Sequence, residues 1–283
     1  MNVLIVGAGA GSWTIRGQQL GAAVGARVTS TPVAADWSWA EVVVLVKRAG
    51  RQWAEVAHQA GVPIVWDALD FWRQPDDNAL GDGAAWDLLG RELGVVRPTL
   101  TIGATRAQAA AADGVYLPHH GRLELEPTPA RETVQTVAYD GDARYLGQWA
   151  PVLDVECRRR GWTFVVNPPD LAAVDLLVAF RDGPFDGWMP RYWKSGVKLV
   201  NAIRAGRPVI GQPSAAWTDL QPLGTPVETF GELSDALDAW GPWGARDRVY
   251  ADSLARAGDY TVEAVGRYYQ QQIARVARRG ISV

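Results

Sequence analysis

The stretch KSGVKLVNAIRAGRPVIGQPSAAW, residues 194–217, decides the fold of the chain around it. Its first part, residues 194–205, has helical spacing and ends at Gly206. Residues 208–210 follow at once as a short apolar strand. A helix that passes directly into a strand is typical of an α/β unit with a parallel sheet.

The same alternation of apolar strands and amphipathic helices runs through the rest of the chain. The first part predicts strands at residues 3–6, 27–31, 42–46, 62–66, 100–103 and 115–117, and helices at 12–24, 51–60, 84–93 and 106–112. The later part predicts strands at residues 133–139, 162–166, 176–180 and 227–230, and helices at 144–160, 233–240, 246–257 and 262–279. Residues 121–131 contain two prolines and no periodicity, which is typical of a linker.

These elements predict an α/β protein of two doubly wound, Rossmann-like domains that face a cleft. The first domain is expected over residues 1–125 and the second over residues 132–260. A C-terminal helix over residues 261–283 is expected to cross back to the first domain. In such folds ligands bind at the carboxyl ends of the strands, so candidate site residues are sought there.

The composition excludes several classes of protein. Hydrophobic residues make up 48% of the 283 residues and charged residues 21%, the proportions of a folded globule and not of a disordered chain. The single cysteine, Cys157, leaves no disulfide framework and no cysteine-based metal site. No apolar run approaches the roughly 20 residues that span a bilayer, and no basic segment precedes the first apolar run. We therefore expect a soluble, cytoplasmic protein without a membrane partner.

The lysines are scarce and gathered in one place. Only three of the 28 basic residues are lysines, and Lys194 and Lys198 lie four positions apart, on one face of the predicted helix. Ser195 and Gly196 open that helix, where free backbone N–H groups favour an anion. Arg181 directly follows a predicted strand and can add a bidentate phosphate contact. The pattern predicts a diphosphate site; the alternative is a solvated helix face.

The same stretch resembles the donor-domain signature of GT-B-fold glycosyltransferases, G-x-K-x-x-E-A-x-x-x-G-x-P-V-I. Here it begins Gly196-x-Lys198-x-x-Asn201 and keeps the spacing throughout, with Asn201 in place of the usual Glu. The resemblance implies that the second domain binds a nucleoside diphosphate sugar, with the basic residues on the diphosphate and Asn201 on the ribose. It also implies that Asp140 and Gly141, after the first strand of that domain, face the donor.

A glycine-rich turn, GAGAGS at residues 7–12, follows the first predicted strand. Glycines there allow the backbone to approach a phosphate or sugar, so we expect Gly11 and Ser12 to contact the nucleotide sugar. Trp13 and Arg16 lie on the first turns of the next helix and are expected to face the cleft. A tight structural turn, with Trp13 as a packing anchor, is the alternative. Ser12 replaces the third glycine of the dinucleotide fingerprint, and no acidic residue follows the second strand, which disfavours NAD.

The resemblance implies a hexosyltransferase that needs neither metal nor cofactor, with a UDP-sugar such as UDP-glucose as the expected co-substrate. A general base would come from the first domain, and the candidates follow two of its predicted strands. They are Asp67, Asp70, His119 and His120. A helix cap is the alternative for Asp67, and a polar hinge is the alternative for the histidine pair.

The acceptor is less defined. The compact, tryptophan-rich chain resembles bacteriophage-type enzymes that act on the hydroxymethyl group of a modified pyrimidine in DNA, in the host cytoplasm. The net charge of −3 counts against binding DNA through bulk charge. Residues 246–283 carry seven arginines, Arg246 among them, and four acidic residues, which predicts a phosphate-binding flank; a solvated helix is the alternative. A saccharide or a small metabolite is an alternative acceptor. An NAD-dependent oxidoreductase and a non-catalytic nucleotide-binding module are alternatives of other classes.

Overall fold

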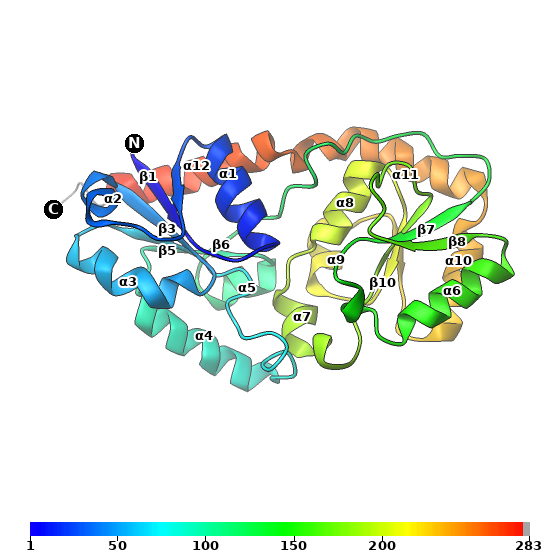
Figure 1. Ribbon diagram of the computed structural model, residues 1–283, viewed down its shortest axis with the longest axis horizontal. Helices are drawn as coiled ribbons and strands as arrows, with labels where there is room; N and C mark the ends of the chain where they lie inside the picture. Colours follow the sequence, from blue (N-terminus) through cyan, green and yellow to red (C-terminus); the bar gives the residue numbers. More distant parts are fainter. Residues whose placement is uncertain (280–283) are drawn as a thin grey trace. The chain divides into compact units, whose positions relative to one another are not determined.

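The computed structural model describes residues 1–279 and contains two compact units, each built on one parallel sheet (Figure 1). Unit 1 comprises Met1–His119, Tyr192–Ser195 and the segment from Val262 onward. Unit 2 comprises His120–Arg191 and Gly196–Thr261. Residues 280–283, the end of the predicted C-terminal helix, lie outside the described residues.

Unit 1 has a six-stranded sheet in the order β2-β1-β3-β4-β5-β6, and every strand pair is parallel. Its strands are β1 (Val3–Val6), β2 (Arg27–Thr29), β3 (Val42–Val46), β4 (Ile64–Asp67), β5 (Leu100–Gly103) and β6 (Val115–Tyr116). Its helices are a π-helical turn η1 (Thr14–Gln19), α1 (Leu20–Ala23), α2 (Ala34–Trp39), α3 (Ala49–Gln59), α4 (Asp82–Val96), α5 (Arg106–Ala111) and α12 (Val262–Arg279). Because the strands are parallel, their carboxyl ends share one edge of the sheet.

The core of unit 1 forms where the central strands are apolar along their whole length. β1 and β3 are buried at every position, as expected for strands of a parallel sheet that is covered on both faces. The helix α12 packs against α1, β3 and β4. It buries Val265, Tyr269 and Ile273, which follow one another at intervals of one helical turn.

Unit 2 has a five-stranded parallel sheet in the order β11-β10-β9-β7-β8. Its strands are β7 (Thr136–Tyr139), β8 (Thr163–Val166), β9 (Leu176–Ala179), β10 (Val209–Gly211) and β11 (Gly224–Pro226). Its helices are η2 (Ala143–Tyr145), α6 (Trp149–Arg159), η3 (Gly183–Phe185), α8 (Val197–Ala205), α9 (Ala215–Leu220), α10 (Phe230–Trp240), α11 (Trp243–Arg256) and η4 (Ala257–Tyr260). The short helix α7 (Trp188–Trp193) begins in unit 2 and ends in unit 1.

The helix predicted over residues 194–205 begins only at Val197, so the prediction that Lys194 and Lys198 share one helix face is wrong. Gly196 interrupts the helix where α9 packs closely. A Cβ atom at Gly196 would lie 2.5 Å from the Leu220 side chain. The predicted end is confirmed, since Gly206 closes α8 with a left-handed φ of 69°.

The strand predicted at residues 227–230 is also wrong. The strand β11 ends at Pro226, and Thr229 instead begins the helix α10. The Thr229 hydroxyl accepts a hydrogen bond from the Glu232 backbone N–H at 3.2 Å, and the Glu232 carboxylate accepts one from the Thr229 N–H at 3.0 Å. This capping box satisfies two backbone donors at once, which favours a helix start at this point.

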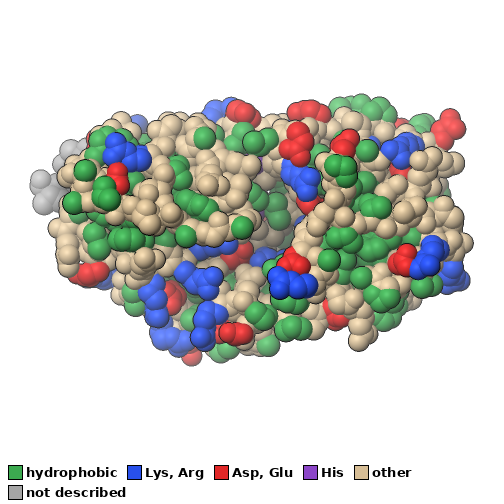
Figure 2. All heavy atoms as spheres, viewed as in Figure 1, with side chains coloured by type: hydrophobic (Ala, Val, Ile, Leu, Met, Phe, Trp, Pro, Cys, Tyr) green, Lys and Arg blue, Asp and Glu red, His purple; other side chains and the backbone are tan. Residues whose placement is uncertain are grey.

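Basic and acidic side chains are interspersed on the face of the molecule that Figure 2 shows. Within residues 1–279, no helix is both long enough and apolar enough to cross a membrane.

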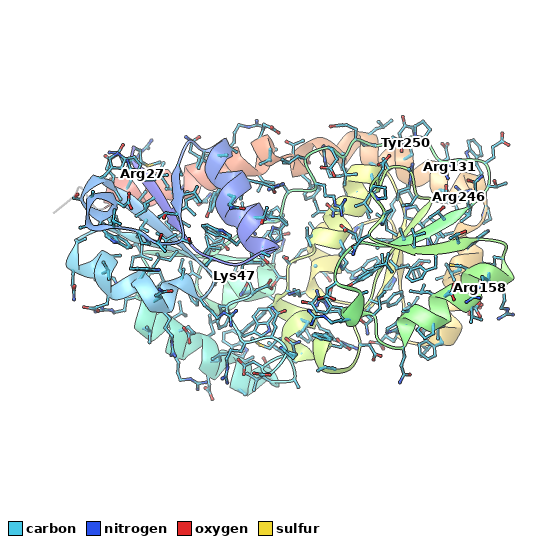
Figure 3. All side chains as sticks on the ribbon, in the orientation of Figure 1. Arg27, Lys47, Arg131, Arg158, Arg246 and Tyr250 are labelled. Carbon is cyan, nitrogen blue, oxygen red and sulfur yellow. The ribbon has the colours of Figure 1, made fainter. Side chains whose placement is uncertain are left out.

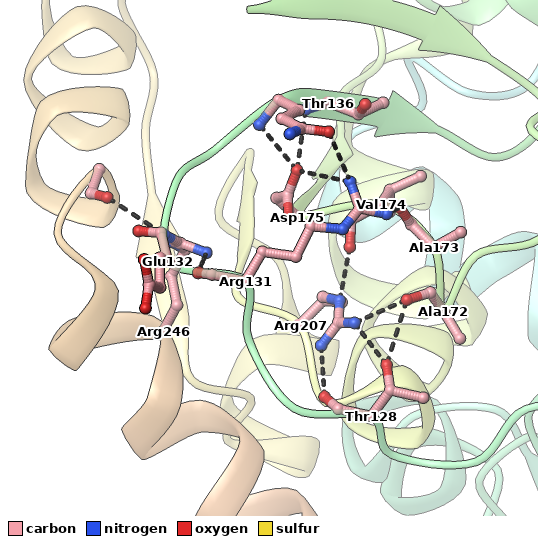
Figure 4. Close-up of polar contacts among 12 residues, drawn as sticks. Thr128, Arg131, Glu132, Thr136, Ala172, Ala173, Val174, Asp175, Arg207 and Arg246 are labelled. Carbon is pink, nitrogen blue, oxygen red and sulfur yellow. Dashed lines mark hydrogen bonds and ion pairs between the residues drawn. The ribbon is translucent and has the colours of Figure 1, made fainter.

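Two buried arginines hold the irregular segment that leads into β7; Figure 3 labels Arg246, and Figure 4 shows it together with Arg207. Arg207 is 5% exposed and donates to the carbonyl oxygens of Thr128 and Val174. Arg246 is 1% exposed and donates to the carbonyl oxygen of Arg131 at 2.8 Å. The prediction that Arg246 belongs to a phosphate-binding flank is therefore wrong, because its guanidinium group is occupied with backbone carbonyls.

Candidate functional site

The carboxyl edge of the unit 1 sheet carries a group of polar side chains around Asp70, here called the Asp70 cluster. Ser12, Lys47 and Asp70 follow the neighbouring strands β1, β3 and β4. The Ser12 hydroxyl donates to the Asp70 carboxylate at 2.9 Å, and the Lys47 ammonium nitrogen lies 4.0 Å from the same carboxylate. The Lys194 ammonium donates to Asp70 at 3.2 Å and to the Gln74 side-chain oxygen at 3.0 Å. Unit 1 thus brings together two of the chain's three lysines on one carboxylate.

The electrostatics of this cluster keep Asp70 ionised. Asp70 is 7% exposed, and burial alone would raise its pKa, but the ammonium groups of Lys194 and Lys47 and the hydrogen bond from Ser12 outweigh burial. The pKa of Asp70 therefore lies well below its usual range. A carboxylate with so low a pKa is a weak general base at neutral pH. The structure supports Asp70 as the group that holds the two lysines and does not support its predicted role as the base.

Asp67 and Arg16 lie in the core of unit 1, both 0% exposed. One Arg16 guanidinium nitrogen is 3.8 Å from the Asp67 carboxylate, and another donates to the Leu117 carbonyl oxygen. Burial raises the pKa of Asp67, and the nearby Arg16 opposes that rise. Tyr269 of α12 is buried beside this pair, and burial raises its pKa well above the ordinary value. The expectations that Arg16 faces a ligand and that Asp67 acts as the base are therefore wrong, because a guanidinium and a carboxylate can be buried together when each offsets the other's charge.

Trp13 is also a core residue, 5% exposed, so the expectation that it faces a cleft is wrong. Its indole ring occupies the space beside two glycines, because a Cβ atom at either Gly7 or Gly17 would overlap with the ring. Gly9 and Gly11 differ: their φ angles are 102° and 57°, and a Cβ atom there would meet nothing within 4 Å. The glycine-rich turn thus serves packing at one end and leaves an exposed backbone at the other.

The histidine pair lies where the chain passes from unit 1 to unit 2. His119 is 2% exposed and His120 is 1% exposed. The Nδ1 atom of His120 lies 2.7 Å from the Gly121 carbonyl oxygen. A role for either ring as the general base stays a prediction.

The carboxyl edge of the unit 2 sheet carries a second polar group, around Asp140, which directly follows β7. The Lys198 ammonium donates to the Asp140 carbonyl oxygen and lies 4.4 Å from the centre of the Tyr139 ring. The Asn201 amide donates to the Asp140 carboxylate at 3.1 Å and accepts from the Arg122 backbone N–H at 3.0 Å. The Arg122 guanidinium pairs with the same carboxylate. Asn201, in place of the usual Glu, thereby links two charged neighbours.

Gly141 and Arg181 complete this second group. Gly141 has a φ of 146°, which favours glycine, and a Cβ atom there would overlap with the Lys198 ammonium unless that group moved. Arg181 follows β9, and its guanidinium lies 5.0 Å from the centre of the Tyr145 ring. Burial raises the pKa of Tyr139 to about 12, against the opposing charge of Arg181. Lys198 and Arg181 therefore place two positive charges near Tyr139.

Most of the predicted site residues fall into two polar groups, and others, such as Trp13, Arg16 and Asp67, are buried in the core of unit 1. Unit 1 gathers Ser12, Asp70 and Lys194, and unit 2 gathers Asp140, Gly141, Arg181, Lys198 and Asn201. Ser195 lies in the turn between α7 and α8. Lys47, Gln74 and Arg122 were not predicted from the sequence as site residues. The scarcity of lysine was a signal for Lys47, because it is the third of only three.

No protein-family model matches the sequence, and a search of curated proteins finds no match. Solved structures do match. The trehalose-6-phosphate synthase OtsA has a TM-score of 0.69 at 8% identity, over 98% of this chain and 99% of that chain. AviGT4, a glycosyltransferase involved in avilamycin A biosynthesis, has a TM-score of 0.56 at 14% identity, over 98% of each chain. A structure described as trehalose-6-phosphate from E. coli bound with UDP-2-fluoro glucose has a TM-score of 0.58 at 10% identity, over 83% of this chain and 73% of that chain.

Other matches are longer than this chain. It spans 57% of the matched chain in a GtfA/B complex and 54% of TarM. At identities between 8% and 14% the likeness concerns the fold. It confirms the predicted fold class, two parallel-sheet α/β domains like those of GT-B glycosyltransferases.

Proposed function

We propose that this chain is a glycosyltransferase that moves a sugar from a nucleoside diphosphate sugar to a hydroxyl group. The observation that carries the proposal is the pair of cations in unit 2, where Lys198 and Arg181 lie at the carboxyl edge of the sheet around Tyr139. Parallel α/β sheets bind ligands at this edge. The fold neighbours support the reaction class, since AviGT4 is a glycosyltransferase and another neighbour is described with UDP-2-fluoro glucose.

The proposed step places negative charge where these cations lie. The acceptor hydroxyl oxygen attacks the anomeric carbon while its proton passes to a general base. The bond from that carbon to the diphosphate oxygen breaks, and the diphosphate leaves with the electron pair. Lys198 is already held by the Asp140 carbonyl oxygen, and Arg181 lies over the Tyr145 ring. Cations that are held in place before the reaction stabilise the leaving group without reorganisation. We propose that they neutralise the diphosphate, so that the transfer needs no metal ion.

The ribose of the donor would lie beside Asn201. This amide is bonded to the Asp140 carboxylate and to the Arg122 backbone, so the three residues form one hydrogen-bonded group. Carboxylate and amide oxygens are suited to accept hydrogen bonds from sugar hydroxyls. We propose that this group binds the ribose, in place of the glutamate that the signature usually has.

The acceptor is proposed for unit 1, and the base for the point where the chain leaves that unit. A modified pyrimidine in DNA stays a prediction, as does a saccharide or a small metabolite. The neighbours described above are not described as acting on DNA, and the interspersed charges in Figure 2 give no support to binding through bulk charge. His119 and His120 stay the predicted bases, and a UDP-sugar stays the predicted donor.

Two measurements test this function and separate it from the other classes. A thermal-shift comparison of UDP, GDP, ADP and NAD is expected to show stabilisation by a nucleoside diphosphate, most strongly by UDP. A coupled assay with a panel of sugar nucleotides is then expected to show release of nucleoside diphosphate. Stabilisation by NAD alone would indicate an oxidoreductase. Diphosphate binding without turnover of any donor would indicate a non-catalytic nucleotide-binding module.

A further inference from the structure

The Asp70 cluster of unit 1 takes no part in the donor chemistry proposed for unit 2. It holds two ammonium groups and one carboxylate, so it carries one surplus positive charge. Lys194 already pairs with Asp70 at 3.2 Å and also bonds Gln74. A single lysine is therefore enough to offset the carboxylate, and Lys47 is additional.

Lys47, which Figure 3 labels, has an unusual backbone conformation. It has a left-handed backbone with a φ of 57°, and its N–H donates to the Asp67 carbonyl oxygen at 2.8 Å. A non-glycine residue in this conformation costs free energy and is concentrated at functional sites. Its side chain is only 21% exposed. The fold therefore fixes this ammonium group at the carboxyl edge of β3 in spite of the cost of the backbone conformation.

The Lys47 ammonium makes no hydrogen bond to any of the described residues 1–279; it pairs with Asp70 at 4.0 Å, and its charge also acts on the buried Asp67. An ammonium has three donors, and a largely enclosed one is costly unless an acceptor satisfies them. The Ser12 hydroxyl joins the same cluster directly after the exposed glycines Gly9 and Gly11. Lysine, a hydroxyl and an open glycine backbone are together suited to a phosphate group.

We propose that Lys47, together with Lys194 and Ser12, binds a phosphate group carried by the acceptor. This inference rests on the proposed function, which assigns the donor diphosphate to Lys198 and Arg181 in unit 2 and leaves the unit 1 cations for the other substrate. The phosphate can belong to a small sugar phosphate or to a nucleic-acid strand, and both present the same oxygens to Lys47. The acceptor is then an anion, not a neutral sugar.

The first experiment measures inorganic phosphate binding to the full chain by calorimetry in the presence of saturating UDP, so that the unit 2 site is already filled. Lys47→Met is expected to weaken phosphate binding at least tenfold, and Lys47→Arg to restore most of it. Arg48→Met is the matched control, because Arg48 is the exposed neighbouring residue, and it is expected to bind phosphate within twofold of wild type. Absence of phosphate binding to the wild-type chain, or equal binding by Lys47→Met, overturns the proposal.

UDP binding by the same variants separates this inference from the proposed function. Lys47→Met is expected to bind UDP within twofold of wild type. A tenfold loss of UDP affinity in Lys47→Met would assign the residue to the donor and overturn the inference. Failure of the wild-type chain to bind UDP or turn over any sugar nucleotide, with phosphate binding still dependent on Lys47, would refute the proposed function and with it the assignment to an acceptor.

The second experiment identifies the source of the phosphate. Binding is compared for a hexose, its 6-phosphate, and a single-stranded oligonucleotide that contains hydroxymethylcytosine, with wild type and Lys47→Met. A tenfold preference for the hexose phosphate over the hexose that Lys47→Met abolishes supports a small sugar phosphate. The same loss confined to the oligonucleotide supports a nucleic-acid strand. No preference for either charged ligand in the wild type overturns the proposal.

Discussion

Replacement of Lys198 by alanine is the most direct perturbation of the diphosphate site. The ammonium is positioned before any ligand arrives, by the Asp140 carbonyl oxygen and by the Tyr139 ring at 4.4 Å. Loss of a hydrogen bond from a charged group costs about 1.5–3 kcal/mol. At about 1.4 kcal/mol for each factor of ten, the Kd for UDP is expected to rise about 10- to 150-fold.

Calorimetry with UDP on the folded variant is the assay, with melting temperature as the check on folding. Arg158→Ala is the matched control, because Arg158 is a basic residue of the same unit whose side chain is 69% exposed and pairs with Asp154 (Figure 3). It is expected to leave the UDP affinity unchanged. Lys198→Arg keeps the charge and is expected to lose less affinity than Lys198→Ala. A Kd for Lys198→Ala within twofold of wild type would refute the assignment of the diphosphate to this lysine.

Gly141→Ala tests the same site from the backbone. A methyl group there overlaps with the Lys198 ammonium and is added at a φ of 146°, which disfavours alanine. Displacement of the ammonium is expected to weaken UDP binding in the same direction as Lys198→Ala. Retained UDP affinity in a folded Gly141→Ala chain would show that the position of this ammonium does not matter for the ligand.

Three further predictions concern buried groups. Arg16→Met leaves the Asp67 carboxylate buried without its partner, and it is expected to lower the free energy of unfolding, measured by urea denaturation, by about 3–5 kcal/mol. The double variant Arg16→Met with Asp67→Leu should recover much of this loss. If it recovers none, the pairing of these two residues is contradicted. Because a raised carboxyl pKa stabilises the fold at low pH and this stability is lost as pH rises through the folded-state pKa, the Arg16→Met deficit should be larger at pH 8 than at pH 5. Arg207→Met deprives several buried carbonyl oxygens of their donor and should cost at least about 3 kcal/mol, so an unchanged urea midpoint would argue against that network. Burial raises the pKa of the Cys157 thiol to about 11, so the native protein at pH 8 should not react with a thiol reagent. The contribution of this thiol to the free energy of unfolding should be lost only as pH rises toward that pKa. Rapid labelling of the native chain at pH 8 would contradict this prediction.

Long and strongly patterned elements were predictable from the sequence. The predicted strands at residues 3–6, 42–46 and 100–103 coincide with β1, β3 and β5, and the predicted helix at residues 262–279 coincides with α12. Strands in the middle of a parallel sheet are buried on both faces, so their sequences are short, continuous apolar runs that indicate a buried strand. The helix α12 carries its apolar residues at helical spacing over many turns.

Short elements could not be predicted in the same way. The helices α2, α7 and α9 were not predicted; each has six residues, which gives a weak 3.6-residue period, although α5 of the same length was predicted at residues 106–112. The start of α8 was misplaced because residues 194–196 fit the helical pattern, whereas close packing of α9 against Gly196 decides where the helix begins. Tertiary packing overrides local preference at such positions.

The sequence by itself determined where the strands end, and thereby which polar residues stand at the carboxyl edges of the two sheets: Ser12 and Asp70 in one, Asp140 and Arg181 in the other. Only the tertiary structure decided which side chains are buried and which of them meet. Hydrophobic periodicity reports on neighbours within a turn or two of the chain. Sheet pairing and helix packing, in contrast, bring Asp70 against Ser12, 58 positions away, and against Lys194, 124 positions away.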